Sequence, residues 1–250
     1  MYQEILNKKR YLFLDELRGF LVLCMVFYHG FLSVNMATGS YIMAQLFDFF
    51  TPVEPYFAGA FIMLSGLCCK FSRSNLKRGL ILLVIALALN ISTFILEKYF
   101  SLNGVTIRFG ILNLLSFCMI FVGLFNFLLK KIPSYLGLII STLGFLLTFI
   151  FISKPNMSYT LVKSPYLFPF GFFNSSFYSA DYFSFFPWVF LFLTGFFICS
   201  LIKKRKETPK FLYFKIPVFE FIGRRTLIIY LAHQPLLYAL TQLIIKIQGE

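Results

Sequence analysis

The sequence predicts an all-α integral-membrane protein, built as a polytopic bundle of about seven transmembrane helices. Of its 250 residues, 59% are hydrophobic and only 13% are charged, whereas about a quarter of an ordinary soluble domain is charged. The apolar residues gather into runs long enough to cross a hydrocarbon core of about 30 Å, which takes roughly 20 helical residues. Without an internal repeat or a separate soluble segment, residues 1–250 are predicted to form a single transmembrane domain.

Seven apolar runs, separated by turn signals, are the predicted spans. The segment 35–55, with its acidic residues and two prolines, is predicted to be a loop. The segment 154–180 is rich in Pro, Ser, Asn and aromatic residues and is predicted to be a functional interfacial lid. The first run is too long for a signal peptide and no cleavage site follows it. The predicted spans cover about 12–34, 56–71, 80–96, 107–129, 133–152, 182–202 and 221–247.

Most Lys and Arg residues fall in alternate loops, which lie on one side of the predicted spans. The N-terminal arm, with Lys8, Lys9 and Arg10, and the loops after the second, fourth and sixth spans carry three, four, two and six Lys or Arg residues. The positive-inside rule therefore predicts a cytosolic N-terminus, an external C-terminus and a multi-pass protein of the plasma (cytoplasmic) membrane. This distribution explains the net charge of +13 without a nucleic-acid partner. The five cysteines have neither metal nor disulfide spacing, and no metal is expected.

The first span carries Arg18 and His29 inside its apolar run. Ionisable groups at membrane depth are costly and usually mark a site. Arg18 is predicted at the cytosolic end, next to Asp15 and Glu16, which are expected to neutralise it. His29 follows about 16 Å further along the helix, in the outer part of the membrane. Its imidazole is a candidate base or nucleophile; the alternative is an interfacial histidine without a chemical role.

His233 lies in the seventh span, two residues before Pro235. It is expected at mid-membrane and therefore at a different depth from His29. Proline removes a backbone donor and often kinks a helix beside a cavity. His233 is predicted either to act in the chemistry or to satisfy the disrupted backbone.

Three arginines are candidates for holding a phosphorylated ligand. Arg224 and Arg225 stand at the cytosolic entrance of the seventh span, on the same side as Arg18. Guanidinium groups grip phosphate bidentately. The alternative for Arg224 and Arg225 is ordinary topology and contact with anionic lipids.

Polar residues near the predicted external face are candidates for contacting an acceptor. Asp48, Arg108 and Asp181 lie near the projected level of His29, and Asn113 lies within the fourth span. A carboxylate there can orient an imidazole or bind a hydroxyl or amine. Asp181 is alternatively a helix N-cap for the sixth span.

Six motifs, in this order and spacing, resemble a known family. They are Leu14–Gly19 (LDELRG), Met25–His29 (MVFYH), Phe61–Gly66 (FIMLSG), Arg108–Asn113 (RFGILN), Asp181–Trp188 (DYFSFFPW) and Gly223–Pro235 (GRRTLIIYLAHQP). The chain resembles the small bacterial branch of the heparan-alpha-glucosaminide N-acetyltransferase-like membrane acyltransferases. The spacing of Arg18 and His29 is also similar to the signature of the O-acyltransferases that decorate surface polysaccharides.

The resemblance implies a cell-envelope enzyme that moves an acetyl or acyl group from cytosolic acetyl-CoA to an external sugar or amine. Its implied site has catalytic, donor-binding and acceptor-binding residues. The family also includes a lysosomal enzyme, and this relation implies that a homodimer within the lipid bilayer is possible. One departure is Asn113, where relatives often have a histidine that can shuttle a proton. The implied catalytic residues are His29, Asp181 and His233; the acetyl-CoA-binding residues are Arg18, Arg224 and Arg225; the substrate-binding residues are Asp48, Arg108, Asn113, Trp188 and Gln234.

Two other functions fit part of the pattern. Intramembrane Arg and His, a proline-kinked helix and a long aromatic loop also suit a small transporter or flippase, although seven spans do not divide into two matching repeats. A non-catalytic membrane sensor is the third possible function. Binding of acetyl-CoA and release of free CoA separate the enzyme from both.

Overall fold

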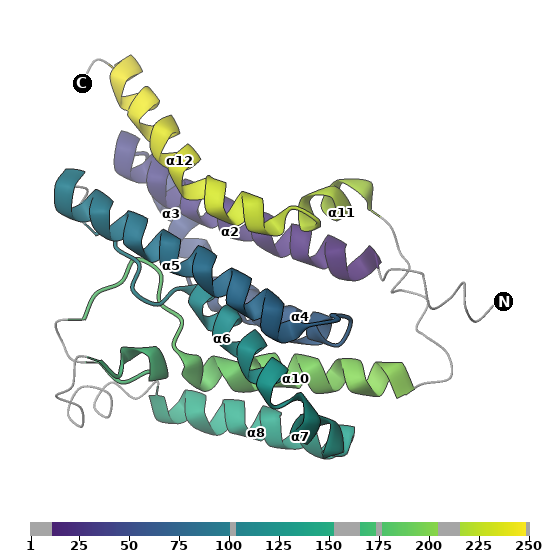
Figure 1. The fold of residues 1–250 in the computed structure, drawn as a ribbon. Helices are drawn as coiled ribbons and strands as arrows, with labels where there is room; N and C mark the ends of the chain where they lie inside the picture. The colour runs from purple at the N-terminus through teal and green to yellow at the C-terminus, as the bar shows by residue number, and fades with distance from the viewer. Residues whose placement is uncertain (1–11, 101–103, 153–165, 174–176, 205–215, 249–250) are drawn as a thin grey trace. The chain divides into compact units, whose positions relative to one another are not determined.

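The computed structural model describes residues 12–100, 104–152, 166–173, 177–204 and 216–248, and these are helical throughout their regular parts. Within them the extended backbone pairs only at an isolated parallel bridge between Phe109 and Tyr182. The all-α prediction is therefore confirmed. The helices (Figure 1) are α2 (Leu12–Thr38), α3 (Tyr41–Phe50), α4 (Glu54–Cys69), α5 (Asn75–Phe100), α6 (Ile111–Leu124), α7 (Asn126–Lys131), α8 (Ser134–Ile152), the 3₁₀ turn η1 (Phe168–Phe170), α10 (Phe185–Lys204), α11 (Pro217–Gly223) and α12 (Thr226–Gln248).

Five of the described helices are long and apolar enough to cross a membrane: α2, α5, α8, α10 and α12. The α3–α4 pair, bent by 51°, makes a sixth candidate if it counts as one broken span. The predicted fourth span is the one that does not appear among these candidate spans. Its helix α6 has 14 residues, about 21 Å at 1.5 Å per residue, and is shorter than a hydrocarbon core. The polytopic membrane class is confirmed, while the count of seven and the side of each terminus stay predictions.

The predicted loop over 35–55 is wrong, because helix occupies most of it. Helix α2 continues to Thr38 and ends at Gly39, whose φ of +64° is the left-handed conformation that closes many helices. Helix α3 then fills Tyr41–Phe50. Pro55, taken as a breaker, is the second residue of α4, where a missing backbone N–H costs nothing.

The predicted seventh span is also interrupted near its start. The short helix α11 ends at Gly223, and α12 begins at Thr226. Arg224 and Arg225 therefore occupy the turn between two helices. The other predictions for the N-terminal arm, most of the lid and the loop after Lys204 lie outside the described residues.

The chain divides into two compact units. The first unit consists of Met1–Phe61 and Glu207–Glu250, and contains α2, α3, the start of α4, α11 and α12. In it α11 and then α12 pack along α2 (Figure 1). At the α2–α11 crossing, a Cβ on Gly19 would lie 2.1 Å from the Phe219 carbonyl oxygen, and one on Gly223 would lie 1.7 Å from that of Asp15. Only glycine allows this approach.

The second unit, Ile62–Lys206, packs α5 against α6 and α8 against α10 (Figure 1). Helix α6 is short but has eight buried residues, so it serves as the interior element of this unit. The end of α4 meets α10 through a second pair of glycines, since a Cβ on Gly66 or Gly195 would lie 1.8 Å from a backbone oxygen of the other helix. Small residues at a helix crossing allow this close packing in a membrane.

Candidate functional site

The two histidines of the chain lie side by side in the first unit, one on α2 and one on α12. The centroids of the His29 and His233 rings are 5.4 Å apart, with the ring planes inclined by 42°. The predicted difference in depth is therefore wrong. The glycine pair Gly19–Gly223 and the histidine pair both differ by 204 in residue number, so the α11–α12 segment runs beside α2 in a constant parallel register.

The tautomer of His233 follows from its hydrogen bond. The side chain is only 6% exposed, and Nδ1 lies 2.5 Å from the carbonyl oxygen of Tyr230. Because a carbonyl can only accept, Nδ1 carries the proton and donates it. Nε2 then presents a lone pair, and it is buried without a hydrogen-bond partner among the described residues. His233 thus satisfies a backbone carbonyl with one nitrogen and keeps the other for a proton.

His29 is held among aromatic rings on its other side. The Tyr28 ring lies edge-on to it, with centroids 5.5 Å apart. Tyr28 is itself stacked on Phe47 of α3 at 4.9 Å, and its hydroxyl is 3.4 Å from the Thr51 hydroxyl. The helix that the sequence failed to predict is therefore the one that fixes the neighbour of His29.

A small cavity of about 160 Å³ adjoins Tyr28 in the same unit. Its wall is aromatic apart from one thiol and one carboxylate. The lining residues are Cys24, Phe27, Tyr28, Phe31, Phe50, Glu54 and Phe57. Aromatic faces together with a carboxylate form an environment that suits a small cation or a polar group with an apolar body.

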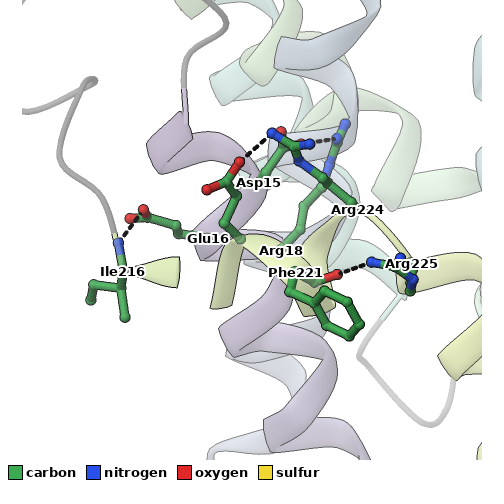
Figure 2. Close-up of polar contacts among 8 residues, drawn as sticks. Asp15, Glu16, Arg18, Ile216, Phe221, Arg224 and Arg225 are labelled. Carbon is green, nitrogen blue, oxygen red and sulfur yellow. Dashed lines mark hydrogen bonds and ion pairs between the residues drawn. The ribbon is translucent and has the colours of Figure 1, made fainter. Parts of the chain in front are cut away.

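Charged residues gather where α2 begins and α11 ends (Figure 2). The buried Asp15 carboxylate accepts from the Arg18 guanidinium, 3.3 Å away, so its predicted role in neutralising Arg18 is confirmed. The equally buried Glu16 accepts the backbone N–H of Ile216, just before α11. Both carboxylates thereby tie the start of α2 to neighbouring groups.

The other two arginines of this end project from the α11–α12 turn (Figure 2). Arg224 pairs with Glu220 one turn earlier, and about 45% of its side chain is exposed. Arg225 lies over the Phe221 ring, 3.8 Å from its centroid, and donates to the Phe221 carbonyl. The structure thus brings the three predicted donor-binding arginines to one end of the first unit, and leaves guanidinium N–H groups of Arg224 accessible to water.

A second group of predicted residues meets in the second unit, around the start of α6. The Asp181 carboxylate accepts the Ile111 N–H at 3.2 Å, and the buried Asn113 side chain accepts the Gly110 N–H at 3.1 Å. These bonds satisfy two N–H groups that a helix start leaves without an intrahelical partner. Asp181 therefore caps α6, a helix 70 residues away in the chain. Arg108 is exposed, 5.7 Å from the Phe177 ring.

The remaining predicted contacts are more dispersed. Trp188 packs at the start of α10 against Phe145 and Phe183. Asp48 is exposed on α3. Gln234 is exposed although it follows the buried His233 directly, because successive residues of a helix point in different directions.

An apolar cavity of about 410 Å³ lies in the second unit, between α8, the start of α10 and Phe172. Thr148 supplies its one hydroxyl, which already donates to Gly144 at 2.6 Å. The other lining residues are Leu147, Phe151, Phe172, Phe186 and Phe190. None of the described residues of this wall carries a titratable side chain.

Sequence reasoning missed Tyr230 and Glu220 as partners in the site. Both stand one helical turn before a predicted residue, Tyr230 before His233 and Glu220 before Arg224. Residues three or four apart share a helix face, so their spacing was a usable signal. The Ile216 contact of Glu16 spans 200 residues and had no local signal.

An all-helical polytopic membrane protein with a paired histidine inside its first unit is the class defined by this geometry. The family model for the heparan-alpha-glucosaminide N-acetyltransferase catalytic domain matches residues 10–235. The chain belongs to this family of membrane acetyltransferases. The match covers both histidines, the three arginines and every other predicted site residue. Comparison with curated proteins finds no match, and comparison with solved structures finds none.

Proposed function

We propose that the protein transfers an acetyl group from cytosolic acetyl-CoA to an amine or hydroxyl of an acceptor on the external side of the plasma membrane. The observation that carries this proposal is the His29–His233 pair, 5.4 Å apart in a chain of an acetyltransferase family. His29 is the partly exposed member, so it is the histidine that meets the reacting groups. His233 is buried and has a lone pair at Nε2.

In this proposal His29 removes the proton of the attacking amine or hydroxyl. The acceptor atom then bonds to the thioester carbonyl carbon, the carbon–sulfur bond breaks, and the CoA thiolate leaves and is protonated. The alternative order places the acetyl group first on a nitrogen of His29, with CoA released before the acceptor attacks. In both orders His233 shares the proton or charge of His29, because its ring lies beside that of His29 and its Nε2 has no hydrogen-bond partner among the described residues.

The arginine end of the first unit suits the donor. Arg224 and Arg225 are both exposed, and CoA carries phosphates that guanidinium groups bind through paired hydrogen bonds. Arg18, pinned by Asp15, keeps further N–H donors. His29 lies eleven residues beyond Arg18, about 16 Å along α2, a span that an extended pantetheine arm can cover. Asp48, Arg108, Asn113, Asp181, Trp188 and Gln234 stay proposed catalytic or acceptor contacts.

The test is turnover in proteoliposomes. Purified wild-type protein, His29→Ala and His233→Ala receive radiolabelled acetyl-CoA on one face and glucosamine as an amine probe on the other. Lys246→Gln, an exposed residue in the last turn of α12, is the matched control for membrane insertion and reconstitution. We expect CoA release and labelled product from the wild type and the control. We expect loss of about 10²–10⁴-fold in His29→Ala, the range of general-base catalysis.

Full transfer by a stably inserted His29→Ala would sink this proposal. Absence of CoA release from all the folded proteins, with glucosamine or any amine or hydroxyl acceptor, would favour a transporter. Single-turnover labelling then separates the two routes. Label retained on the wild-type protein without acceptor and lost in His29→Ala supports an acetyl-histidine, whereas no retained label supports direct transfer.

A further inference from the structure

The positive charge of the chain is concentrated in the second unit. Residues 62–206 hold fourteen Lys and Arg but only two acidic residues, Glu97 and Asp181, giving +12 of the net +13. Eight of the described cations stand where α4 and α10 end, α5 begins and α7 lies. They are Lys70, Arg73, Lys77, Arg78, Lys130, Lys131, Lys203 and Lys204.

Contacts among the described residues show that these segments meet. Lys203 donates to the Lys70 carbonyl at 2.7 Å, and the Asn75 side chain donates to the Cys69 carbonyl at 3.1 Å. The start of α5 crosses α6 at Gly79, where a Cβ would lie 2.9 Å from the Ile120 nitrogen. Helix α7, with Lys130, follows α6 directly. The lysine cluster is defined as Lys70, Lys130, Lys203 and Lys204.

The ammonium groups of two lysines of the cluster lie over aromatic rings. The Lys70 ammonium lies 4.0 Å from the centroid of Phe196, a side chain that is only 1% exposed. The Lys203 ammonium lies 4.2 Å from the Phe71 centroid. Burial lowers the pKa of Lys70; nearby Cys199 opposes this effect, and Lys130, Lys203 and Lys204 add to it. A cation held in such surroundings gains from a nearby anion.

The described part of this unit supplies no such anion at this end. Glu97 accepts the Thr106 N–H at 2.8 Å and Asp181 accepts the Ile111 N–H. Both therefore lie near the start of α10, while Lys203 and Lys204 form its last turn. A helix of 20 residues separates the two ends by about 30 Å.

We propose that the lysine cluster binds the phosphate of an anionic membrane phospholipid. The cluster stands at the ends of membrane-crossing helices, the level at which lipid phosphates lie, and its aromatic rings place the ammonium groups at the apolar boundary. Soluble phosphates meet the same charges only from bulk water. Lipid phosphates are instead permanently present beside α4 and α10. The lysine cluster consists of residues of the second unit alone, and the proposal does not depend on the proposed acetyl transfer.

The experiment measures lipid retention and thermal unfolding in a non-ionic detergent. Wild-type protein is titrated with phosphatidylglycerol or with phosphatidylcholine, and bound lipid is counted by native mass spectrometry. The test variant is Lys70→Gln with Lys203→Gln. The matched control is Lys98→Gln, which removes a lysine that also lies over aromatic rings, Phe94 and Tyr99, but near the opposite end of the unit.

We expect phosphatidylglycerol to bind and to raise the unfolding temperature in wild type and Lys98→Gln, with phosphatidylcholine much weaker. Each lysine near an anionic surface contributes about fivefold in affinity, so the double variant should bind roughly 25-fold more weakly. Lys70→Arg with Lys203→Arg should restore binding and guards against a double variant that fails to fold. Equal binding of the two lipids, or unchanged binding by the glutamine variant, would overturn the proposal. Displacement of the lipid by millimolar CoA or inorganic phosphate would assign the site to a soluble phosphate instead and would also overturn it.

Discussion

The two units treat charge in opposite ways although both are built from apolar helices. The first unit has nine cations and eight acidic residues, against fourteen and two in the second. In the first unit, two buried acids have partners in the same unit. Asp15 pairs with Arg18, and Glu16 accepts the backbone N–H of Ile216. In the second unit Glu97 accepts the backbone N–H of Thr106 and Asp181 accepts that of Ile111 at the start of α6, so neither acid pairs with the lysine cluster in the described part of the unit. The comparison shows that the described acids of the first unit include two buried carboxylates with partners in the same unit, whereas the two acids of the second unit bind backbone N–H groups away from the lysine cluster.

The units share one packing device despite this difference. Each contains a crossing in which two glycines let the helix backbones touch, Gly19–Gly223 in the first unit and Gly66–Gly195 in the second. In a membrane, where burying apolar surface gives little gain, close backbone approach is a main source of helix association. Substitutions of these glycines are therefore expected to reduce the stability of either unit most.

The largest expected effect comes from filling these crossings. Gly223→Ala places a methyl 1.7 Å from the Asp15 carbonyl oxygen, and Gly195→Ala places one 1.8 Å from that of Met63. Backbone cannot swing aside as a side chain can, so we expect a loss of about 3 kcal/mol of stability in either unit. Reversible unfolding in mixed micelles measures it.

Gly30→Ala is the control for these variants. It lies on the same helix as Gly19, but its new methyl would meet the Leu237 side chain at an ordinary 3.7 Å. Alanine also favours helix over glycine by roughly 1 kcal/mol, so this variant should be neutral or slightly more stable. Equal losses in Gly30→Ala and Gly223→Ala would show that close backbone approach does not govern stability at these sites.

The second prediction tests charge pairing directly. Arg18→Gln removes the guanidinium that pairs with the buried Asp15 carboxylate, and we expect a loss of about 1–3 kcal/mol of stability. Lys204→Gln in the second unit removes an exposed cation at the end of α10 and should change stability by no more than about 0.5 kcal/mol in neutral detergent. Chemical unfolding of both variants compares them. Similar losses would remove the distinction between the units.

The sequence predicted the helical segments well because long apolar runs are a local signal. It failed where one residue type had two meanings: Pro55 was read as a breaker but begins a helix, and Gly223 was not recognised as a helix end. It failed again on the depth of His233, because depth was counted from the start of each span. The crossing of Gly19 with Gly223 sets the register instead, and such a long-range contact leaves no trace in local periodicity.

The candidate site was predictable in its residue types more than in its pairings. Intramembrane His and Arg were recognisable by their cost in an apolar setting. That His29 meets His233, and that Asp181 caps a helix 70 residues earlier, depends on how distant segments pack. Asn113 was identified as a departure from the histidine common in relatives, and its cap bond to Gly110 gives it a structural role that an amide can fill.

The third prediction concerns that cap. Asn113→Ala and Asp181→Ala each free one N–H at the start of α6, and we expect losses of about 1 kcal/mol apiece. Asp48→Ala, an exposed acid outside this cap, should leave stability unchanged. Thermal unfolding of the three variants, with transfer activity measured at a temperature where all are folded, separates the roles. An Asp181→Ala protein that stays folded but loses transfer would support the proposed catalytic role beyond the cap.

The smallest effect on stability is expected at Arg224, and there the comparison between stability and function is sharpest. Its half-exposed pair with Glu220 is a one-turn helix pair of a kind worth about 0.3–0.5 kcal/mol, so Arg224→Gln should hardly change unfolding. If Arg224 binds the donor phosphates, the same variant should weaken acetyl-CoA binding by about tenfold, because a charge-assisted bond to an ion contributes about 1.5–3 kcal/mol. Titration calorimetry with acetyl-CoA measures this affinity, with Lys246→Gln on the far end of α12 as the charge-matched control. An unchanged affinity in Arg224→Gln would remove this arginine from the donor site and leave it as part of the helix turn, whereas a loss shared by Lys246→Gln would point to net charge instead of a specific contact.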